Sequence, residues 1–290
     1  MSAAPTETAR GVGGASGKAI LVGEHFVVYG APAIAIPVRG RGVTVRLRRE
    51  PGPWAVPAAA LAHMTAMVRH LGLDPDALTV ALEATLPLGV GLGGSASVAA
   101  ALVRATGVAD PVEVQRMAHA LEELAHGTPS GLDDTTVAYE RPIWFRRGQP
   151  PEVLAPRALP MLLAVTPPGG STKVAVAGVA AWRAHNAARF AAILARSEAI
   201  AHAAREGLVA SDLAAVGAAM NEAHELLSEV GVSTPTLDRV VARARALGAH
   251  GAKLTGAGLG GAVLVCAPPA LAPDLEAALR AEGAEEVFPV

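Results

Sequence analysis

A glycine-rich segment from Pro87 to Ser97 is the strongest sign of chemistry in this chain of 290 residues. It reads Pro-Leu-Gly-Val-Gly-Leu-Gly-Gly-Ser-Ala-Ser, and the small residues after it predict a helix over 95–106. Glycines let backbone amides approach a polyanion, and a helix N-terminus adds free N–H groups and the positive end of its dipole. We therefore predict a phosphate-binding loop in which the Ser95 hydroxyl reaches a phosphate-bound metal. A helix N-cap that serves packing alone is the alternative.

Carboxylates form a second group. Glu122 lies on a predicted helix that Asp110 caps, and after the turn Thr128-Pro129-Ser130-Gly131 the chain carries Asp133 and Asp134, which we expect on a loop. A helix carboxylate beside a loop carboxylate can place one on a magnesium ion and the other near a substrate hydroxyl. A solvated acidic helix end is the simpler interpretation, but it explains Asp133 poorly because the turn before it looks ordered.

A third group surrounds a predicted strand over 19–22. Lys18 precedes this strand, and Glu24 and His25 follow it after a glycine. Lysine is rare in the chain: the others are Lys173 and Lys253, so 21 of the 24 basic residues are arginine. A lysine kept in such a chain is a candidate for a role that needs a compact ammonium, such as a point charge on a phosphate.

Two familiar nucleotide-binding motifs fit less well. Gly89, Gly91 and Gly94 match the spacing of the dinucleotide fingerprint, but Gly256, Gly258 and Gly261 repeat that spacing, so the match is weak in a glycine-rich chain. No lysine follows the first set of glycines, which excludes a Walker P-loop there.

The elements that must position these groups mix strands and helices without strict alternation, which favours an α+β fold in two lobes. Residues 1–16 look like a loose terminus. Strands are expected at 19–22, 33–38, 43–48, 78–82, 142–145, 159–165, 250–254, 261–266 and 286–290. Helices are expected at 57–71, 95–106, 110–126, 172–205, 211–229, 235–247 and 270–282.

Composition narrows the function classes. The net charge of −2 and the lack of a polybasic run argue against nucleic acid and anionic membranes as partners. One cysteine, Cys266, excludes an intrachain disulfide and is expected to be buried in a strand. The N-terminus carries no signal-peptide pattern, so a cytoplasmic protein is expected.

Together, three segments resemble the signatures of the GHMP kinases. These are Gly17-Lys-Ala-Ile-Leu-Val-Gly-Glu-His-Phe-Val-Val-Tyr-Gly30, the glycine-rich segment at 87–97, and Lys253-Leu-Thr-Gly-Ala-Gly-Leu-Gly-Gly261. Within that family the first segment, with His-Gly-Thr-Pro-Ser-Gly-Leu-Asp at 126–133, is most similar to the mevalonate kinases. The chain departs from the family pattern at Gly94, Asp134 and Leu259.

The resemblance implies a two-lobed fold with the active site in the cleft between lobes, and the transfer of the γ-phosphate of ATP, with Mg²⁺, to the primary hydroxyl of mevalonate. It implies that Asp133 and Lys18 are catalytic and that Glu122 and Ser95 hold the metal. The phosphate loop would comprise Gly89, Gly91, Leu92, Gly93, Gly94, Ser95, Ala96 and Ser97. The mevalonate end would comprise Glu24, His25, Thr172, Gly256, Ala257 and Gly258.

The domain boundary is expected between residues 167 and 168, giving a catalytic domain over 1–167 and an α+β domain over 168–290. The expected partners are mevalonate and ATP, and a homodimer is the assembly considered. A kinase for phosphomevalonate or a sugar is the nearest alternative, with Arg39, Arg41 and Arg183 as candidates for an extra anion site. A non-catalytic nucleotide-binding regulator comes next, and a dinucleotide-dependent oxidoreductase is last.

Overall fold

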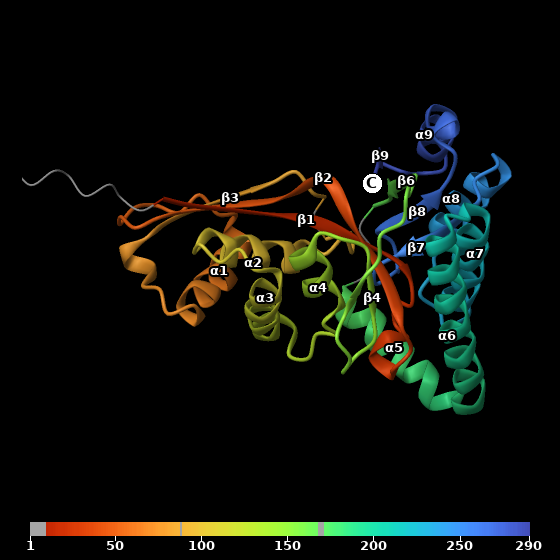
Figure 1. Ribbon diagram of the computed structural model, residues 1–290, viewed down its shortest axis with the longest axis horizontal. Coiled ribbons are helices and arrows are strands. Elements are labelled where there is room, and N and C mark those ends of the chain that lie inside the picture. The colour runs from red at the N-terminus through yellow and green to blue at the C-terminus, as the bar shows by residue number, and fades with distance from the viewer. Residues whose placement is uncertain (1–9, 88, 168–170) are drawn as a thin grey trace, which may run out of the picture. The chain divides into compact units, whose positions relative to one another are not determined.

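The structure is a computed structural model that describes residues 10–87, 89–167 and 171–290. Residues 1–9 of the predicted terminus, Leu88 of the glycine loop and residues 168–170 of the predicted boundary segment lie outside the described residues. Helices and strands are mixed along the chain, as the sequence predicts (Figure 1). The described part of the chain contains no helix that combines the length and the apolar character needed to cross a membrane.

The described residues form two sheets. The first has the order β1, β2, β4, β5, with β3 also paired to β2, and the second has the order β7, β8, β6, β9. The strands of the first sheet are β1 (Arg10–Val22), β2 (Ala33–Arg48), β3 (Thr79–Ala84), β4 (Ile143–Phe145) and β5 (Glu152–Val153). Those of the second are β6 (Met161–Val165), β7 (Gly251–Thr255), β8 (Ala262–Cys266) and β9 (Glu286–Pro289).

Contacts divide the chain into two compact units whose segments alternate in sequence. Unit 1 comprises the chain up to Gly17, Arg41–Leu86 and Gly94–Glu140. Unit 2 comprises Lys18–Gly40, Pro87–Gly93 and Arg141–Val290. The strands β1 and β2 each contribute residues to both units, so the signature segments are also divided between them.

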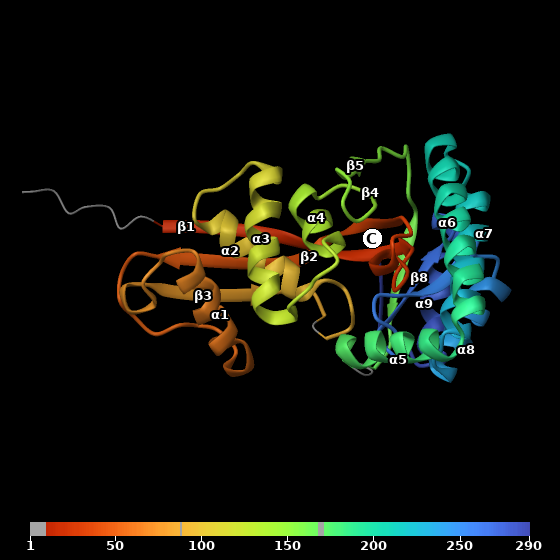
Figure 2. The ribbon, with the colours of Figure 1, turned by 90° about the horizontal axis from the view of Figure 1, so that it is seen from below.

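In unit 1, four helices cover one face of the strands β1, β2 and β3 (Figures 1 and 2). Their aliphatic faces form the core with alternate residues of β2, such as Val43, Val45 and Leu47. β2 pairs antiparallel with β3 from Val43 opposite Ala84 to Arg48 opposite Thr79. The helices are α1 (Ala58–His70), α2 (Gly94–Ala105), α3 (Pro111–His126) and α4 (Leu132–Tyr139).

In unit 2, helices pack on the antiparallel second sheet. α7 and α8 both contact β7, and the core joins Leu227 and Leu237 of these helices to Leu254 of β7. Two aromatic residues, Phe26 and Phe190, belong to the same core. The helices are α5 (Thr172–His185), α6 (Ala187–Ala210), α7 (Leu213–Glu229), α8 (Pro235–Ala246) and α9 (Ala272–Ala281).

Several expectations about elements are confirmed. Asp110 caps α3 by accepting a hydrogen bond from the Glu113 N–H, with Pro111 at the first helical position. α2 begins at Gly94, directly before Ser95. Cys266 is fully buried in β8, where burial raises the pKa of its thiol to about 11.

Three expectations are wrong. The separate strands predicted at 33–38 and 43–48 are one continuous strand, β2. The helix predicted over 172–205 is two helices separated at Asn186, whose backbone leaves the helical region with φ −130° and ψ 42°. Residues 10–16 are not loose but belong to β1. This glycine-rich part of the strand runs against α2: a Cβ at Gly11 would lie 1.9 Å from the Ala105 carbonyl oxygen, and one at Gly13 would lie 2.1 Å from that of Ala101. The glycines therefore permit close packing rather than flexibility.

Candidate active site

Lys18 lies against the glycine loop at 87–94. Its backbone N–H donates to the Leu92 carbonyl at 3.0 Å, and its side chain is almost wholly buried. Gly93 has a positive φ of 74°, and a Cβ there would lie 2.7 Å from Cγ of Lys18. Glycine at position 93 is therefore required twice, by the backbone conformation and by the space that the Lys18 side chain occupies.

The loop after β7 packs on the same glycine loop. Gly256 has a φ of 87°, and a Cβ at this position would lie 2.8 Å from the carbonyl oxygen of Gly91. Gly258 approaches the Val232 carbonyl in a similar way, with a Cβ expected at 2.3 Å. The second and third signature segments thus meet backbone to backbone in unit 2.

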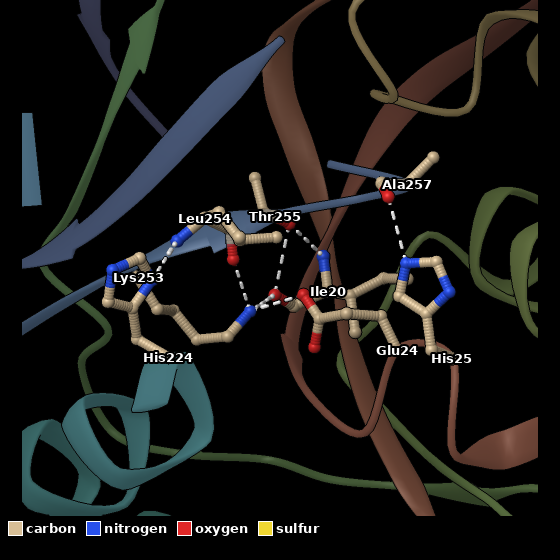
Figure 3. Close-up of polar contacts among 8 residues, drawn as sticks. All are labelled: Ile20, Glu24, His25, His224, Lys253, Leu254, Thr255 and Ala257. Carbon is tan, nitrogen blue, oxygen red and sulfur yellow. Dashed lines mark hydrogen bonds and ion pairs between the residues drawn. The ribbon is translucent and has the colours of Figure 1, made fainter. Parts of the chain in front are cut away.

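The turn after β1 presents Glu24 and His25, both buried (Figure 3). His25 adopts a left-handed conformation with φ 62°, which is rare for a residue with a side chain. Its Nε2 donates to the Ala257 carbonyl at 2.8 Å. Burial lowers the pKa of His25 below its ordinary value, so the ring is neutral near pH 7 and its Nδ1 is a hydrogen-bond acceptor.

Lys253, which the sequence analysis did not assign to the site, pairs with Glu24. It is fully buried on β7, and its ammonium forms an ion pair with Oε1 of Glu24 (Figure 3). Burial lowers the pKa of Lys253, whereas the charge and hydrogen bond of Glu24 act in the opposite direction. The scarcity of lysine in the chain was the feature of the sequence that could have pointed to Lys253. We call Lys18, Glu24, His25 and Lys253 the lysine cluster.

Ser95 and Glu122 meet in unit 1. Ser95, in the first turn of α2, donates a hydrogen bond from Oγ to Oε1 of Glu122 on α3 at 2.5 Å. Both atoms are hard oxygen donors, which suit Mg²⁺, and Mg²⁺ in phosphoryl-transfer sites commonly takes one or two protein oxygens together with phosphate oxygens. Among the described residues no group of three His, Cys, Asp or Glu side chains is arranged to hold a metal. Ser95 and Glu122 are thus two oxygen groups that could contribute to a Mg²⁺ site.

Asp133 and Asp134 lie in the first turn of α4, so their expected placement on a loop is wrong. Gly131 caps the helix in a left-handed conformation that glycine adopts readily. Both carboxylates thus lie at the helix end where acidic residues are commonly found. The physical reason for the error is that Pro129 and Gly131 indicate a turn but give no sign that a helix begins directly after it.

Asp134 is buried and bonded to α3. Its Oδ2 accepts hydrogen bonds from Gln115 at 2.8 Å and from Nδ1 of His119 at 3.2 Å. Burial raises the pKa of Asp134, whereas Gln115 and His119 act in the opposite direction. Asp134 thus joins the helix that carries Asp133 to the helix that carries Glu122. We call Ser95, Glu122, Asp133 and Asp134 the acidic cluster.

The remaining predicted residues have varied surroundings. Gly89 and Gly91 have positive φ angles, Ala96 is buried, and the Ser97 hydroxyl donates to the Ser16 carbonyl at 2.8 Å. Thr172 is exposed at the start of α5, where Ser171 caps the helix. The structure therefore brings Glu24, His25 and Ala257 together, but it shows no hydrogen bond from Thr172 to them within the described residues.

Two family models match the chain. The model described as GHMP kinases N terminal domain covers residues 58–141, and that described as GHMP kinases C terminal covers residues 204–285.

Known relatives include mevalonate kinases of archaea. The chain is 32% identical to the mevalonate kinase of Thermococcus gammatolerans, over 88% of each sequence. It is 33% identical to that of Aeropyrum pernix, over 86% of each.

Among solved structures, L. major mevalonate kinase in complex with R-mevalonate aligns with a TM-score of 0.85 and 29% identity, over 100% of this chain and 98% of that one. A Lactococcus lactis galactokinase complexed with galactose aligns with a TM-score of 0.75 over 97% of this chain and 92% of that one, but at 16% identity it supports the fold alone.

Proposed function

The chain belongs to the GHMP kinase family, and on this premise we propose that it transfers the γ-phosphate of ATP to the primary hydroxyl of mevalonate. The observation that carries the reaction class is the packing of Lys18 against Gly93 of the glycine loop. A buried ammonium beside backbone amides of a glycine loop suits a phosphoryl group whose charge develops on its outer oxygens. The similarity to mevalonate kinases supports the acceptor.

We assign the proton transfer to Asp133. Its carboxylate takes the proton of the acceptor hydroxyl, whose oxygen attacks the γ-phosphorus of ATP while the bond to the β–γ bridging oxygen breaks and ADP leaves. Lys18 stabilises the oxygen that loses its proton and the phosphoryl group in transfer. Because phosphoryl transfer needs positioning and charge stabilisation more than covalent help, two such residues account for most of the chemistry.

Ser95 and Glu122 are the residues that would hold Mg²⁺. The metal would supply charge neutralisation at the β- and γ-phosphate oxygens. The backbone N–H groups of residues 91–97 would donate hydrogen bonds to the oxygens of those phosphates. At the other end, His25 and Glu24 would face the acceptor, together with Thr172 and the Gly256–Gly258 loop.

A phosphorylated acceptor remains the nearest alternative. Its extra phosphate would need a second cationic subsite. Of the arginines considered for it, Arg183 lies over the ring of Tyr29, 4.8 Å from its centre. Arg39 lines a hollow of about 400 Å³ with Arg141 and Arg157. The assay below therefore includes a phosphorylated acceptor.

The boundary at 167/168, the cytoplasmic location and the homodimer stay predictions. The two matched family models fall on opposite sides of the proposed boundary, but β6, which precedes it, pairs with β8 and β9, which follow it.

The test is a coupled ADP-release assay with mevalonate, 5-phosphomevalonate, homoserine and galactose, each with MgATP. We expect mevalonate to give the highest kcat/KM by at least about tenfold, which corresponds to about 1.4 kcal/mol in transition-state binding. The Asp133→Asn variant is the control for contaminating kinase. Preference for another acceptor would overturn the assignment of mevalonate, and ATP binding without ADP release would favour a non-catalytic regulator.

A further inference from the structure

Lys253 has its three N–H donors matched by three acceptors. Besides Oε1 of Glu24, its Nζ donates to the Leu254 carbonyl at 2.5 Å and to the Ile20 carbonyl at 3.3 Å (Figure 3). An ammonium has three donors, whereas a guanidinium has five and is larger. In a fully buried position an arginine would leave donors without acceptors, which is costly. This accounts for lysine here in a chain that otherwise prefers arginine.

Lys253 is one of three residues, spaced two apart in sequence, that contact residues 20–25. Thr255 Oγ1 accepts from the Ile20 N–H at 2.8 Å and donates to the Ile20 carbonyl at 3.0 Å, and the Ala257 carbonyl accepts from His25. Lys253 and Thr255 lie two apart on β7 and point to the same face, whereas Ala257 lies in the loop after the strand and contacts His25 through its backbone carbonyl. β7 and its loop therefore hold the end of β1 and the turn after it at three successive points.

Glu24 is held by one oxygen only. Oε1 takes the ion pair, while Oε2 is buried and has no hydrogen-bond partner among the described residues. A buried carboxylate oxygen without a partner costs free energy, which a hydroxyl donor would recover. The adjacent residue, His25, is kept in its left-handed conformation beside Ala257. Such backbone strain persists only where the surroundings fix it.

We propose that Lys253 is a positioning residue for the acceptor alcohol. By holding Oε1 of Glu24 and the end of β1, it presents Oε2 of Glu24 to a hydroxyl of the acceptor and keeps His25 on the Gly256–Gly258 loop. This inference rests on the proposed kinase function and adds to it a residue that acts through Glu24 rather than on the substrate.

The experiment compares Lys253→Met with Lys173→Met, a matched control because Lys173 is exposed on α5. KM for mevalonate, KM for ATP and kcat are measured for both variants. We expect Lys253→Met to raise the mevalonate KM at least tenfold and to change the ATP KM less than twofold, and we expect Lys173→Met to change neither. Lys253→Arg should not restore the mevalonate KM, since the five donors of arginine do not fit the three acceptors.

Folding is controlled with the double variant Lys253→Met/Glu24→Gln, which removes both charges of the pair. It should fold and keep a raised mevalonate KM, because no ammonium fixes the amide oxygen. An unchanged mevalonate KM in this variant would overturn the proposal. Equal increases of both KM values with a lowered melting temperature would show a structural role only and would also overturn it.

Hydrogen exchange of the amides at 20–25 gives a readout that does not need turnover. We expect exchange at least tenfold faster in Lys253→Met than in the wild type and in Lys173→Met, and unchanged exchange would contradict the proposal. If the wild type phosphorylates another acceptor of the panel, its KM replaces that of mevalonate. Wild-type inactivity on every acceptor would refute the proposed function, while the exchange result would still decide whether Lys253 fixes this segment.

Discussion

The lysine cluster and the acidic cluster differ in how their charges are held. In the lysine cluster Lys18, Glu24 and Lys253 are all buried, and residues far apart in sequence supply the partners. In the acidic cluster Glu122 and Asp134 are buried as well, whereas Asp133 and Ser95 are partly exposed at helix starts. The lysine cluster is thus buried throughout, whereas the acidic cluster combines two buried carboxylates with two partly exposed side chains at helix starts.

This difference has a functional meaning. Groups that must be fixed before a small acceptor binds gain from burial, because burial removes alternative rotamers and strengthens each ion pair. Ser95 and Asp133, which are partly exposed, would remain open to groups that arrive with the substrates. The comparison predicts that substitutions in the two clusters change different measured properties of the protein.

The largest effects are expected for Lys18→Met and Asp133→Asn, one variant from each cluster. Each removes charge stabilisation or proton transfer that is used mainly in the transition state, so kcat should fall about 10³-fold or more. ATP affinity, measured by calorimetry, should change less than about threefold. If only one of the variants loses turnover, the reaction depends on a single cluster and the comparison fails.

A smaller effect is expected for Glu122→Gln. Loss of the carboxylate weakens a hard oxygen ligand, so the Mg²⁺ concentration for half-maximal rate should rise about tenfold. Glu123→Gln is the matched control, because Glu123 is the next residue on α3 and its side chain is exposed. An identical magnesium titration in the two variants would argue against the metal role of Glu122.

Acid should act in opposite directions on His224, which lies beside the lysine cluster, and on Asp134 of the acidic cluster. His224, which accepts a hydrogen bond from the Leu254 N–H beside Lys253, has its pKa lowered to about 4 by burial and by the charges of Arg245 and Lys253. The folded state then binds fewer protons than the unfolded state, so the free energy of unfolding falls by about 2 to 3 kcal/mol as pH drops from 6.5 to 4. The raised pKa of Asp134 works the other way, since its contribution is lost as pH rises above about 3.8.

Urea unfolding between pH 4.5 and 7.5 measures both contributions. His224→Gln should make the loss of stability on acidification less steep, and Asp134→Asn should make it steeper. His185→Gln, at an exposed position on α5, is the control. Parallel pH profiles for all variants would show that neither buried group determines the acid response.

The smallest effect is expected at Leu259, where the third signature segment departs from glycine. Leu259 has a φ of 60°, and this left-handed conformation costs a leucine roughly 1–2 kcal/mol. Leu259→Gly relieves that strain but adds freedom to the unfolded chain worth about 0.4–1 kcal/mol, so a net gain of about 0.5 kcal/mol is expected in the free energy of unfolding. Leu247→Gly, at a position with φ −87°, should instead lose stability.

Local signals predicted local structure well. Asp110 and Pro111 marked the start of α3, and the glycine loop marked the start of α2. The break at Asn186 was missed because neither glycine nor proline stands there. The strand over 10–16 was missed because its glycines looked like a flexible terminus, whereas they fit against α2.

The sequence by itself determined which residue types are available and which segments carry them: the glycine loops, the carboxylates, and three lysines beside 21 arginines. It also determined the family, because each signature segment is an unbroken run of residues that can be read directly from the sequence. Only the tertiary structure decided that Lys253 pairs with Glu24, 229 residues away. The physical reason is that a buried ammonium is stable only where folding supplies its acceptors, and those acceptors come from distant segments that no local pattern can specify.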